Sequence, residues 1–195
     1  MTAERIEELL NAQRAYFKSG ATLGYGFRMD ALGRLYDALV KREGDIADAV
    51  KADLGKSAYE TYMCETGQVK SEISYLKKHL KSMMKPVKVH TPFSQYPSKG
   101  FRVPNPYGNV LIMSPWNYPL LPTLEPLTNA IAAGNTAMVK PSAYSPSVSA
   151  VLADILGGIF DERYVAVVTG GRSENAAPLG GRFDMVFFTG RTDGG

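Results

Sequence analysis

Cysteine and histidine are scarce in this sequence, and each scarcity excludes a class of site. The 195 residues contain one cysteine, Cys64, and two histidines, His79 and His90. One cysteine excludes an internal disulfide and suits a reducing compartment, so we expect a cytoplasmic protein. The histidines do not recur with cysteine or acidic residues at a metal-binding spacing, so no metal site is predicted. They also lie far along the chain from the polar turns described below, which disfavours a histidine-assisted hydrolase.

Long hydrophobic runs and a strong charge of one sign are missing as well. No apolar run reaches the roughly 18 residues of a transmembrane helix, so no membrane span is predicted. The first residues, Met1–Arg5, lack the apolar stretch of a secretory signal. The net charge of +3 comes from interspersed acidic and basic residues, which is too weak and scattered for nucleic-acid binding. The apolar share of 45% is typical of a globular chain.

Residues 1–86 carry apolar side chains every three or four positions, which predicts helices. We expect three of them, ended by Gly20, Gly44 and Gly55. Ser57 and Glu60 form a capping-box pattern at the start of a fourth, long helix. That helix should stop before Pro86 and be irregular near Gly67.

The chain changes in composition at residues 87–105, because three prolines within this stretch, flanked by Pro86 and Pro106, accompany short alternating apolar pairs. This pattern predicts an extended β-arm and a boundary rather than a packed helix.

From residue 106 onward the pattern alternates between strands and helices. Strands are predicted at 110–113, 136–139, 164–168 and 185–188, with helices at 120–133, 145–156 and 173–179. Ser145 is expected to cap the second of these helices, with Pro146 at its first position. Repeated βα units predict an α/β fold with a parallel sheet covered by helices on both faces.

Polar or glycine-rich turns follow each predicted strand, and ligands of open α/β sheets bind at those strand ends. The first turn, Ser114–Pro119, places Asn117 between two prolines that fix φ, so its amide could hold a developing oxyanion. An asparagine that merely bonds its own backbone is the alternative. Lys140 could bind a ribose or phosphate, or could extend its ammonium to solvent. The turn 190–195 has the spacing of a phosphate loop, although it could also be a frayed end.

An ordered series of motifs resembles the amino-terminal part of an aldehyde dehydrogenase, most like the class 3 or fatty-aldehyde branch. The motifs are Asp53-Leu54-Gly55-Lys56-Ser57, Lys85-Pro86, residues 106–112, residues 114–119, residues 130–135, Val139-Lys140-Pro141-Ser142, residues 167–171 and residues 187–190. The resemblance implies a helical segment joined to a partial Rossmann-like sheet, and NAD(P)-dependent oxidation of an aldehyde to a carboxylic acid. It also implies a homo-oligomer formed through the β-arm, with a small aldehyde as substrate.

The resemblance assigns roles to individual residues. Asn117 matches the amide that donates to the oxyanion formed on a catalytic cysteine. The residues that would bind NAD or NADP are Met113, Pro115, Trp116, Lys140, Ser142, Gly170, Thr189, Gly190, Arg191 and Gly195.

Three departures from the family pattern qualify these roles. Ala143 replaces the usual glutamate that clasps the adenosine ribose, so a weaker preference for NAD is expected. Arg191 and Gly194 stand where serine and valine are common. The sequence also stops before the family's catalytic glutamate and cysteine, so we expect no turnover by these residues alone. Cys64 is expected to be structural. Two alternatives to an aldehyde-oxidising function are a noncatalytic dinucleotide-binding or interaction fragment and an acylating member of the superfamily.

Overall fold

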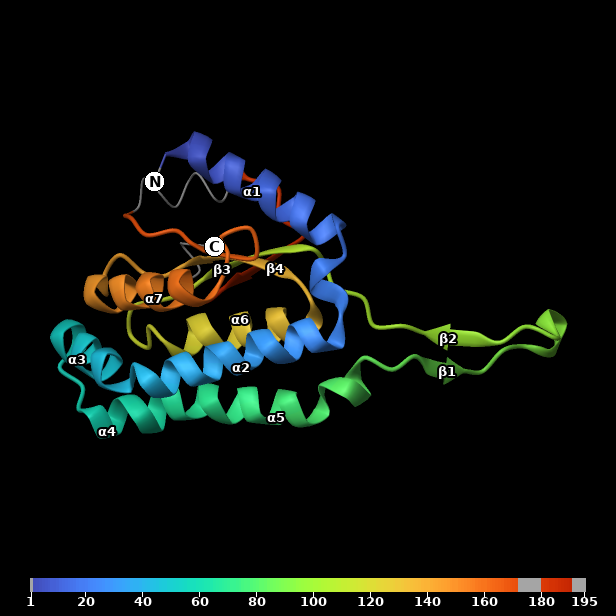
Figure 1. The fold of residues 1–195 in the computed structure, drawn as a ribbon, viewed down its shortest axis with the longest axis horizontal. Helices are drawn as coiled ribbons and strands as arrows, with labels where there is room; N and C mark the ends of the chain where they lie inside the picture. The colour runs from blue at the N-terminus through green and yellow to red at the C-terminus, as the bar shows by residue number, and fades with distance from the viewer. Residues whose placement is uncertain (1, 172–179, 191–195) are drawn as a thin grey trace.

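A computed structural model describes residues 2–171 and 180–190 as helical layers around a parallel sheet (Figure 1). Helix α1 (Ala3–Lys18) covers one face of the sheet. Helices α6 (Leu121–Ala133) and α7 (Pro146–Ile159) cover the other face. Helices α2 (Tyr25–Lys41) and α5 (Gly67–Met83) form a further layer against α6. The predicted α/β fold with helices on both faces is therefore confirmed.

The main sheet contains four described strands that all run parallel, in the order β5-β4-β3-β6. They are β3 (Asn109–Met113), β4 (Thr136–Lys140), β5 (Val165–Val167) and β6 (Met185–Phe188). From β3 the chain adds β4 and β5 on one side, whereas β6 joins on the other. The strand order therefore reverses between β3 and β6, which is where ligands bind in open α/β sheets.

Two hydrophobic clusters hold the helices to the sheet. Successive side chains of a strand point to opposite faces. Val110 and Ile112 of β3 therefore join the large cluster formed with α2, α5, α6 and α7. Leu111 and Met113 face the smaller cluster, which contains Ile6, Leu9 and Leu10 of α1.

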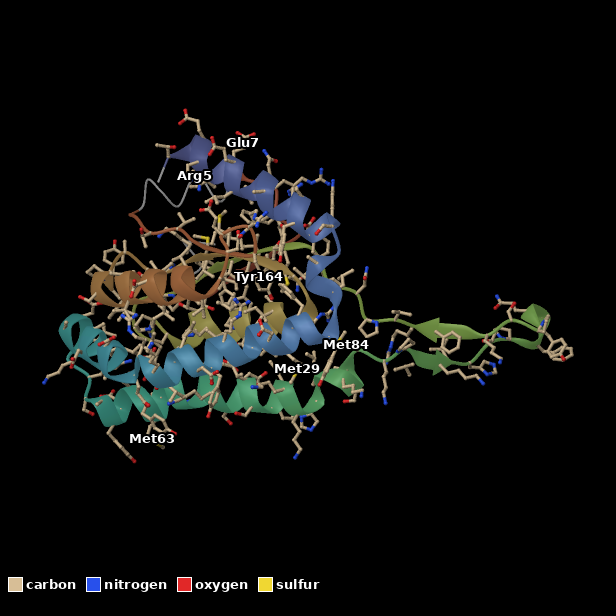
Figure 2. The ribbon with its side chains drawn as sticks, viewed as in Figure 1. Arg5, Glu7, Met29, Met63, Met84 and Tyr164 are labelled. Carbon is tan, nitrogen blue, oxygen red and sulfur yellow. The ribbon has the colours of Figure 1, made fainter. Side chains whose placement is uncertain are left out.

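Tyr164 lies inside this packing, between the sheet and the helices (Figure 2). Its ring meets Phe27 and Phe160 edge-on, with centroids 4.9 and 5.5 Å apart. Burial raises the pKa of its hydroxyl, so Tyr164 stays neutral in the core.

Most of the helix ends and caps predicted for the amino-terminal segment are confirmed. Gly20 follows α1 and Gly55 ends α3 (Glu43–Leu54), with φ of 76° and 71°, a left-handed conformation that favours glycine. Ser57 Oγ accepts a hydrogen bond from Glu60 N at 3.1 Å and starts α4 (Ala58–Thr61).

The irregularity predicted near Gly67 is a π-helical turn, Tyr62–Thr66, between α4 and α5. A Cβ at Gly67 would lie 2.6 Å from the Tyr62 carbonyl oxygen. The position next to the Tyr62 carbonyl therefore requires glycine.

The predicted role of Gly44 is wrong. Helix α2 ends at Lys41, and Gly44 is the second residue of α3. Arg42 makes the break instead, with φ of −103° and ψ of 18°. Its guanidinium pairs with Asp45 and with Asp154 on α7, the latter at 2.7 Å. These ion pairs fix the chain where a glycine stop was expected.

Ser145 occupies the predicted N-cap position of α7 and Pro146 begins the helix, but the Ser145 side chain makes no capping hydrogen bond. Ser145 Oγ turns toward the Ser142 carbonyl oxygen, 3.4 Å away. The Asp53 carboxylate from α3 accepts hydrogen bonds from Ser147 N and Val148 N at 3.2 and 2.9 Å. A carboxylate is the better partner here because the amino end of a helix carries positive partial charge.

A two-stranded antiparallel ribbon projects from the body, made of β1 (Val87–Val89) and β2 (Gly100–Arg102) (Figure 1). A 3₁₀ turn, Phe93–Gln95, lies at its tip. Val87, Val89, Phe101 and Val103 are exposed along it. The extended arm thus appears as expected, while its role in oligomerisation and the division into 1–86, 87–105 and 106–195 stay predictions. The helix predicted at 173–179 lies outside the described residues.

Replacing Asp53 with alanine should destabilise the protein by about 1–2 kcal/mol, because two amides of α7 lose a charged acceptor. Urea unfolding followed by circular dichroism measures this change. Asp48→Ala is the matched control, since Asp48 lies exposed on the same helix. Equal unfolding midpoints for the two variants would contradict the assigned cap.

Replacing Gly134 with alanine should cost about 1–3 kcal/mol of folding free energy. Gly134 has a φ of 92°, and a Cβ there would lie 2.6 Å from Arg28 Nη2. Gly157→Ala in α7 is the control, because nothing lies within 4 Å of its Cβ position. Gly157→Ala should leave the thermal midpoint equal or higher, and a similar loss in both variants would refute the strain.

Candidate functional site

The carboxyl ends of the described strands form one edge of the sheet, and hydrogen bonds join them beyond the strands themselves. Ser114 N donates to the Lys140 carbonyl at 3.3 Å, and Thr189 N donates to the Met113 carbonyl at 3.0 Å. Val168 N donates to the Val139 carbonyl at 2.8 Å. The structure therefore brings the polar turns after β3, β4, β5 and β6 together in one row.

Asn117 lies in the turn between β3 and α6, which follows the strand at which the strand order reverses. Its residue is exposed. Two contacts fix the turn around it. Lys56 Nζ donates to the Asn117 carbonyl at 2.9 Å, and Thr123 Oγ1 lies 2.6 Å from the Pro119 carbonyl oxygen. Both contacts are to backbone carbonyls, so the role of the Asn117 side chain stays a prediction.

The start of α6 rests on Glu65 of the π-turn. Glu65 is fully buried, and its Oε2 accepts from Leu120 N at 2.7 Å and from Leu121 N at 3.3 Å. Its other oxygen, Oε1, pairs with Lys56 Nζ at 3.0 Å. One ion pair from the amino-terminal helices thus holds both the turn and the helix that follows it.

Lys140 is buried at the end of β4 rather than extended to solvent, so the solvent-exposed alternative is wrong. Its Nζ donates to the Pro141 carbonyl at 3.0 Å and to the Gly170 carbonyl at 2.9 Å. The ammonium therefore ties the β4 turn to the β5 turn. Contact with a ribose stays a prediction.

The turn from Ser142 to Ser145 connects β4 to α7. Ser142 is half-buried, and its Oγ accepts from Tyr144 N at 3.2 Å. Ala143 and Tyr144 are exposed beside it. Asp53 already occupies the first free amides of α7, so the positive end of this helix has a protein partner.

The remaining residues assigned to the cofactor fall into three environments. Met113 is buried in the cluster on the α1 side, whereas Trp116 is 52% exposed and Pro115 half-buried at the open edge. Gly170, Thr189 and Gly190 follow β5 and β6 at the same edge. Arg191 and Gly195 lie outside the described residues.

Cys64 sits in the π-turn next to Glu65 and is partly exposed. His79 lies on α5, where its Nδ1 is 2.7 Å from the Tyr75 carbonyl oxygen, and His90 follows β1 in the arm. Across residues 2–171 and 180–190, no cluster of His, Cys, Asp and Glu side chains is arranged to hold a metal ion. No helix in that part is long and apolar enough to cross a membrane.

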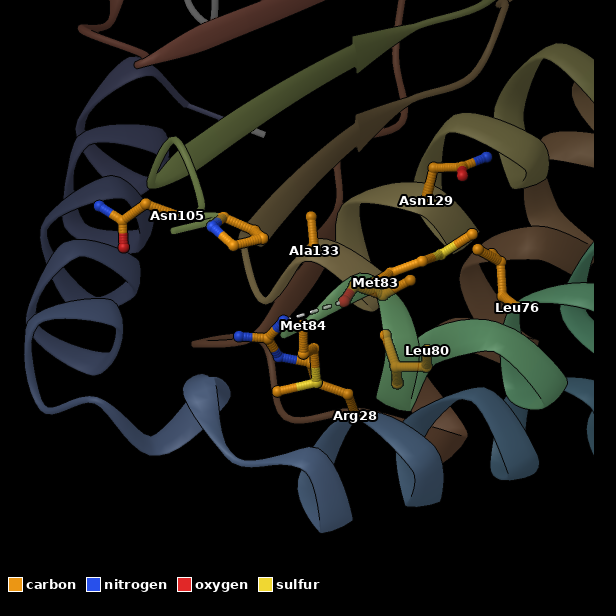
Figure 3. Close-up of a pocket in the computed structure, with 10 residues that line it drawn as sticks. Arg28, Leu76, Leu80, Met83, Met84, Asn105, Asn129 and Ala133 are labelled. Carbon is orange, nitrogen blue, oxygen red and sulfur yellow. Dashed lines mark hydrogen bonds between the residues drawn. The ribbon is translucent and has the colours of Figure 1, made fainter. Parts of the chain in front are cut away.

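A separate pocket of about 230 Å³ lies at the base of the arm, between α5 and α6 (Figure 3). Its walls are mainly apolar, with Leu80 and Met83 from α5 and Ala133 from α6. Arg28 reaches its floor and donates to the Ala132 carbonyl at 3.1 Å. Burial lowers the pKa of this guanidinium. The lining contains none of the residues predicted for the site, so the pocket is distinct from the strand-end row.

Two asparagines of the sequence motifs act at the opposite end of the sheet. Asn135 Oδ1 accepts from Gly108 N at 3.0 Å, and Asn109 Nδ2 donates to the Leu10 carbonyl at 3.3 Å. They fasten the amino ends of β3 and β4. These two residues therefore have a structural role.

Sequence reasoning missed Lys56, Glu65 and Asp53 as residues that shape the site. Asp53 and Lys56 both belong to a motif of the family resemblance, but the motif by itself predicts no contact for either side chain. No local pattern links them to partners 55 to 95 residues away. The π-turn that presents Glu65 was signalled only as an irregularity near Gly67.

Comparisons with known proteins show which family shares this sequence and fold. The sequence matches the description "Aldehyde dehydrogenase family" over residues 1–195. The 4,4'-diaponeurosporen-aldehyde dehydrogenase of Staphylococcus aureus is 40% identical over 185 residues, which are 95% of this chain and 40% of that protein. Aldehyde dehydrogenase family 3 member B1 of Rattus norvegicus is 38% identical over 189 residues, which are 97% of this chain and 40% of that protein.

A solved structure, described as the substrate-bound state of Staphylococcus aureus AldH, superposes with a TM-score of 0.92 at 39% identity. The match covers 94% of this chain and 40% of that chain. The present chain thus spans about 40% of the length of these relatives and corresponds to their amino-terminal part. Because the family match covers residues 1–195 and the relatives are similar over nearly all of these residues, the chain belongs to the aldehyde dehydrogenase family.

Proposed function

We propose that this chain serves the NAD(P)-dependent oxidation of an aldehyde to a carboxylic acid, and that it supplies the dinucleotide site and the oxyanion donor. The observation that carries the proposal is the position of Asn117 at the reversal of strand order, within the row of polar turns. Aldehyde dehydrogenase family membership gives the reaction class.

The residues at the strand ends fit a dinucleotide. The reversal between β3 and β6 leaves the half-buried Thr189 on one side and the exposed Trp116 on the other. At Gly190 a Cβ would lie 2.6 Å from the Phe188 ring, so glycine lets the β6 turn pass close to that ring. When bound, the nicotinamide would accept a hydride from the substrate. Lys140 would keep the β4 and β5 turns in register beneath the adenosine end.

Asn117 would donate its side-chain amide to the oxygen that becomes negative in the reaction. A neutral donor of this kind stabilises the transition state by about 3–4 kcal/mol when its position is fixed beforehand. The exposed position of Asn117 at the edge leaves its amide accessible to a substrate.

The nucleophile is the part of the reaction that these residues do not supply. Cys64, the sole cysteine of the sequence, belongs to the π-turn, in which Glu65 accepts hydrogen bonds from the start of α6. We therefore propose that the 195 residues bind a dinucleotide without oxidising an aldehyde, and that a longer protein or a partner provides the reactive thiol. The exposed apolar arm would pair with a second copy. A cytoplasmic location rests on the cysteine count.

Ala143 predicts which of the two cofactors the chain prefers. Calorimetric titration should show NADP binding at least as tightly as NAD, because Ala143 offers no carboxylate to repel a 2′-phosphate. Ala143→Glu should shift the affinity ratio toward NAD by about tenfold, through a charge-assisted bond to the ribose and repulsion of the phosphate. Ala150→Glu, at an exposed position of α7, is the control and should leave the ratio unchanged. Strong NAD preference in the unmodified chain would count against the proposal.

Another prediction concerns turnover. The purified 195-residue chain, given NAD or NADP and a long-chain or aromatic aldehyde, should form no reduced cofactor above the buffer rate, as measured at the nicotinamide absorbance band. Nucleotide binding in the same preparation separates this result from a failure to fold. Clear aldehyde-dependent reduction would refute the claim that the nucleophile lies elsewhere, and absence of any nucleotide binding would favour an interaction fragment.

A further inference from the structure

The turn that carries Asn117 lacks the regular hydrogen bonding of the strand before it and the helix after it. Residues 114–120 lie between the end of β3 and the start of α6 without belonging to either. Pro115 and Pro119 fix two φ angles. The orientation of the peptide groups between these prolines depends on contacts from elsewhere in the fold.

The Lys56 ammonium makes three contacts, two of them with this segment. Nζ donates to the Asn117 carbonyl at 2.9 Å and lies 3.7 Å from the centroid of the Tyr118 ring. Its third contact is Glu65 Oε1 at 3.0 Å. An ammonium has three donors, and here each faces either the turn or the carboxylate that supports the next helix.

Glu65 completes the arrangement from the other side. Its side chain is fully buried, and its two oxygens are shared between Lys56 and the Leu120 and Leu121 amides. A buried carboxylate costs free energy unless it is fully paired, and buried ion pairs contribute little to stability compared with apolar packing. Stability alone is therefore a weak reason for this pair. What the pair does fix is the peptide group of Asn117 and the first turn of α6.

We propose that Lys56 and Glu65 are positioning residues, which hold the Asn117 turn so that its amide is aimed before a substrate binds. The inference rests on the proposed role of Asn117. Its physical basis is that a misplacement of about 1 Å in a catalytic group can lower a rate by roughly a hundredfold. A lysine and a glutamate in the amino-terminal helices thereby set the geometry of a donor that follows the first strand of the sheet.

The chain offers a local probe and a matched control. Trp116 is the sole tryptophan of the sequence and adjoins Asn117. Lys70 pairs with Glu43 at 3.1 Å and lies over the Tyr62 ring at 4.7 Å. It resembles Lys56 in its own burial and in contacting a glutamate and a tyrosine, although Glu43 is partly exposed and Glu65 is buried. Lys70 Nζ has these contacts on α3 and the π-turn, whereas Lys56 Nζ contacts the Asn117 turn.

The experiment compares Lys56→Met, Glu65→Gln and Lys70→Met in the 195-residue chain. Time-resolved anisotropy of Trp116 reports the motion of the turn, and hydrogen exchange followed by NMR reports the Leu120 and Leu121 amides. Lys56→Met and Glu65→Gln should increase the fast anisotropy decay. Glu65→Gln should also speed exchange at the Leu120 and Leu121 amides about tenfold, because one charge-assisted hydrogen bond is lost. Lys70→Met should change neither signal, even if it lowers the melting temperature.

Lys56→Arg should restore most of the Trp116 anisotropy, because it returns a cation to the same place. Unchanged anisotropy in Lys56→Met would overturn the proposal, as would equal changes in Lys70→Met. If Glu65→Gln does not fold, the two Lys56 variants still decide the question. Nucleotide titration of the same samples keeps the outcomes apart: an ordered turn that depends on Lys56 but binds no dinucleotide would refute the proposed function and leave the positioning intact.

Discussion

Parallel pairing of the strands in the order β5-β4-β3-β6 is the constraint on which the rest of the structure depends. Because all pairs are parallel, every carboxyl end reaches the same edge, and the polar turns of four separate motifs become neighbours. Buried strands of this kind need cover on both faces. Helix α1 covers one face, and α6 and α7 cover the other, with α2 and α5 packed behind them.

The amino-terminal helices also shape the edge. Asp53 caps α7, Glu65 supports α6, and Lys56 holds the Asn117 turn. All three residues lie within a short stretch around the end of α3 and the π-turn. The helical segment is therefore an integral part of the candidate site, because its side chains hold turns and helix starts that follow the strands.

Much of the fold could be predicted from the sequence because its signals are local. Apolar periodicity located the helices and strands, and Gly20, Gly55 and Ser57 act as expected. Gly44 misled the prediction, because the break between the helices lies at Arg42, whose side chain pairs with Asp154 of α7. Ser145 holds the predicted N-cap position of α7, but the side-chain capping bonds come from Asp53 of α3. The strand-end turns could be anticipated from alternation alone. Lys56 and Glu65 could not, since a tertiary contact across 55 or more residues leaves no periodic trace in one sequence.

The central claim is that a nicotinamide dinucleotide binds at the carboxyl edge, across the reversal between β3 and β6. Mapping amide chemical shifts by NMR as NADP is added tests it most directly. The account predicts that the largest changes fall on the turns after β3, β4, β5 and β6, at Ser114, Ser142, Gly170 and Thr189. Changes centred on the pocket at the base of the arm, or no changes at saturating NADP and NAD, would contradict it.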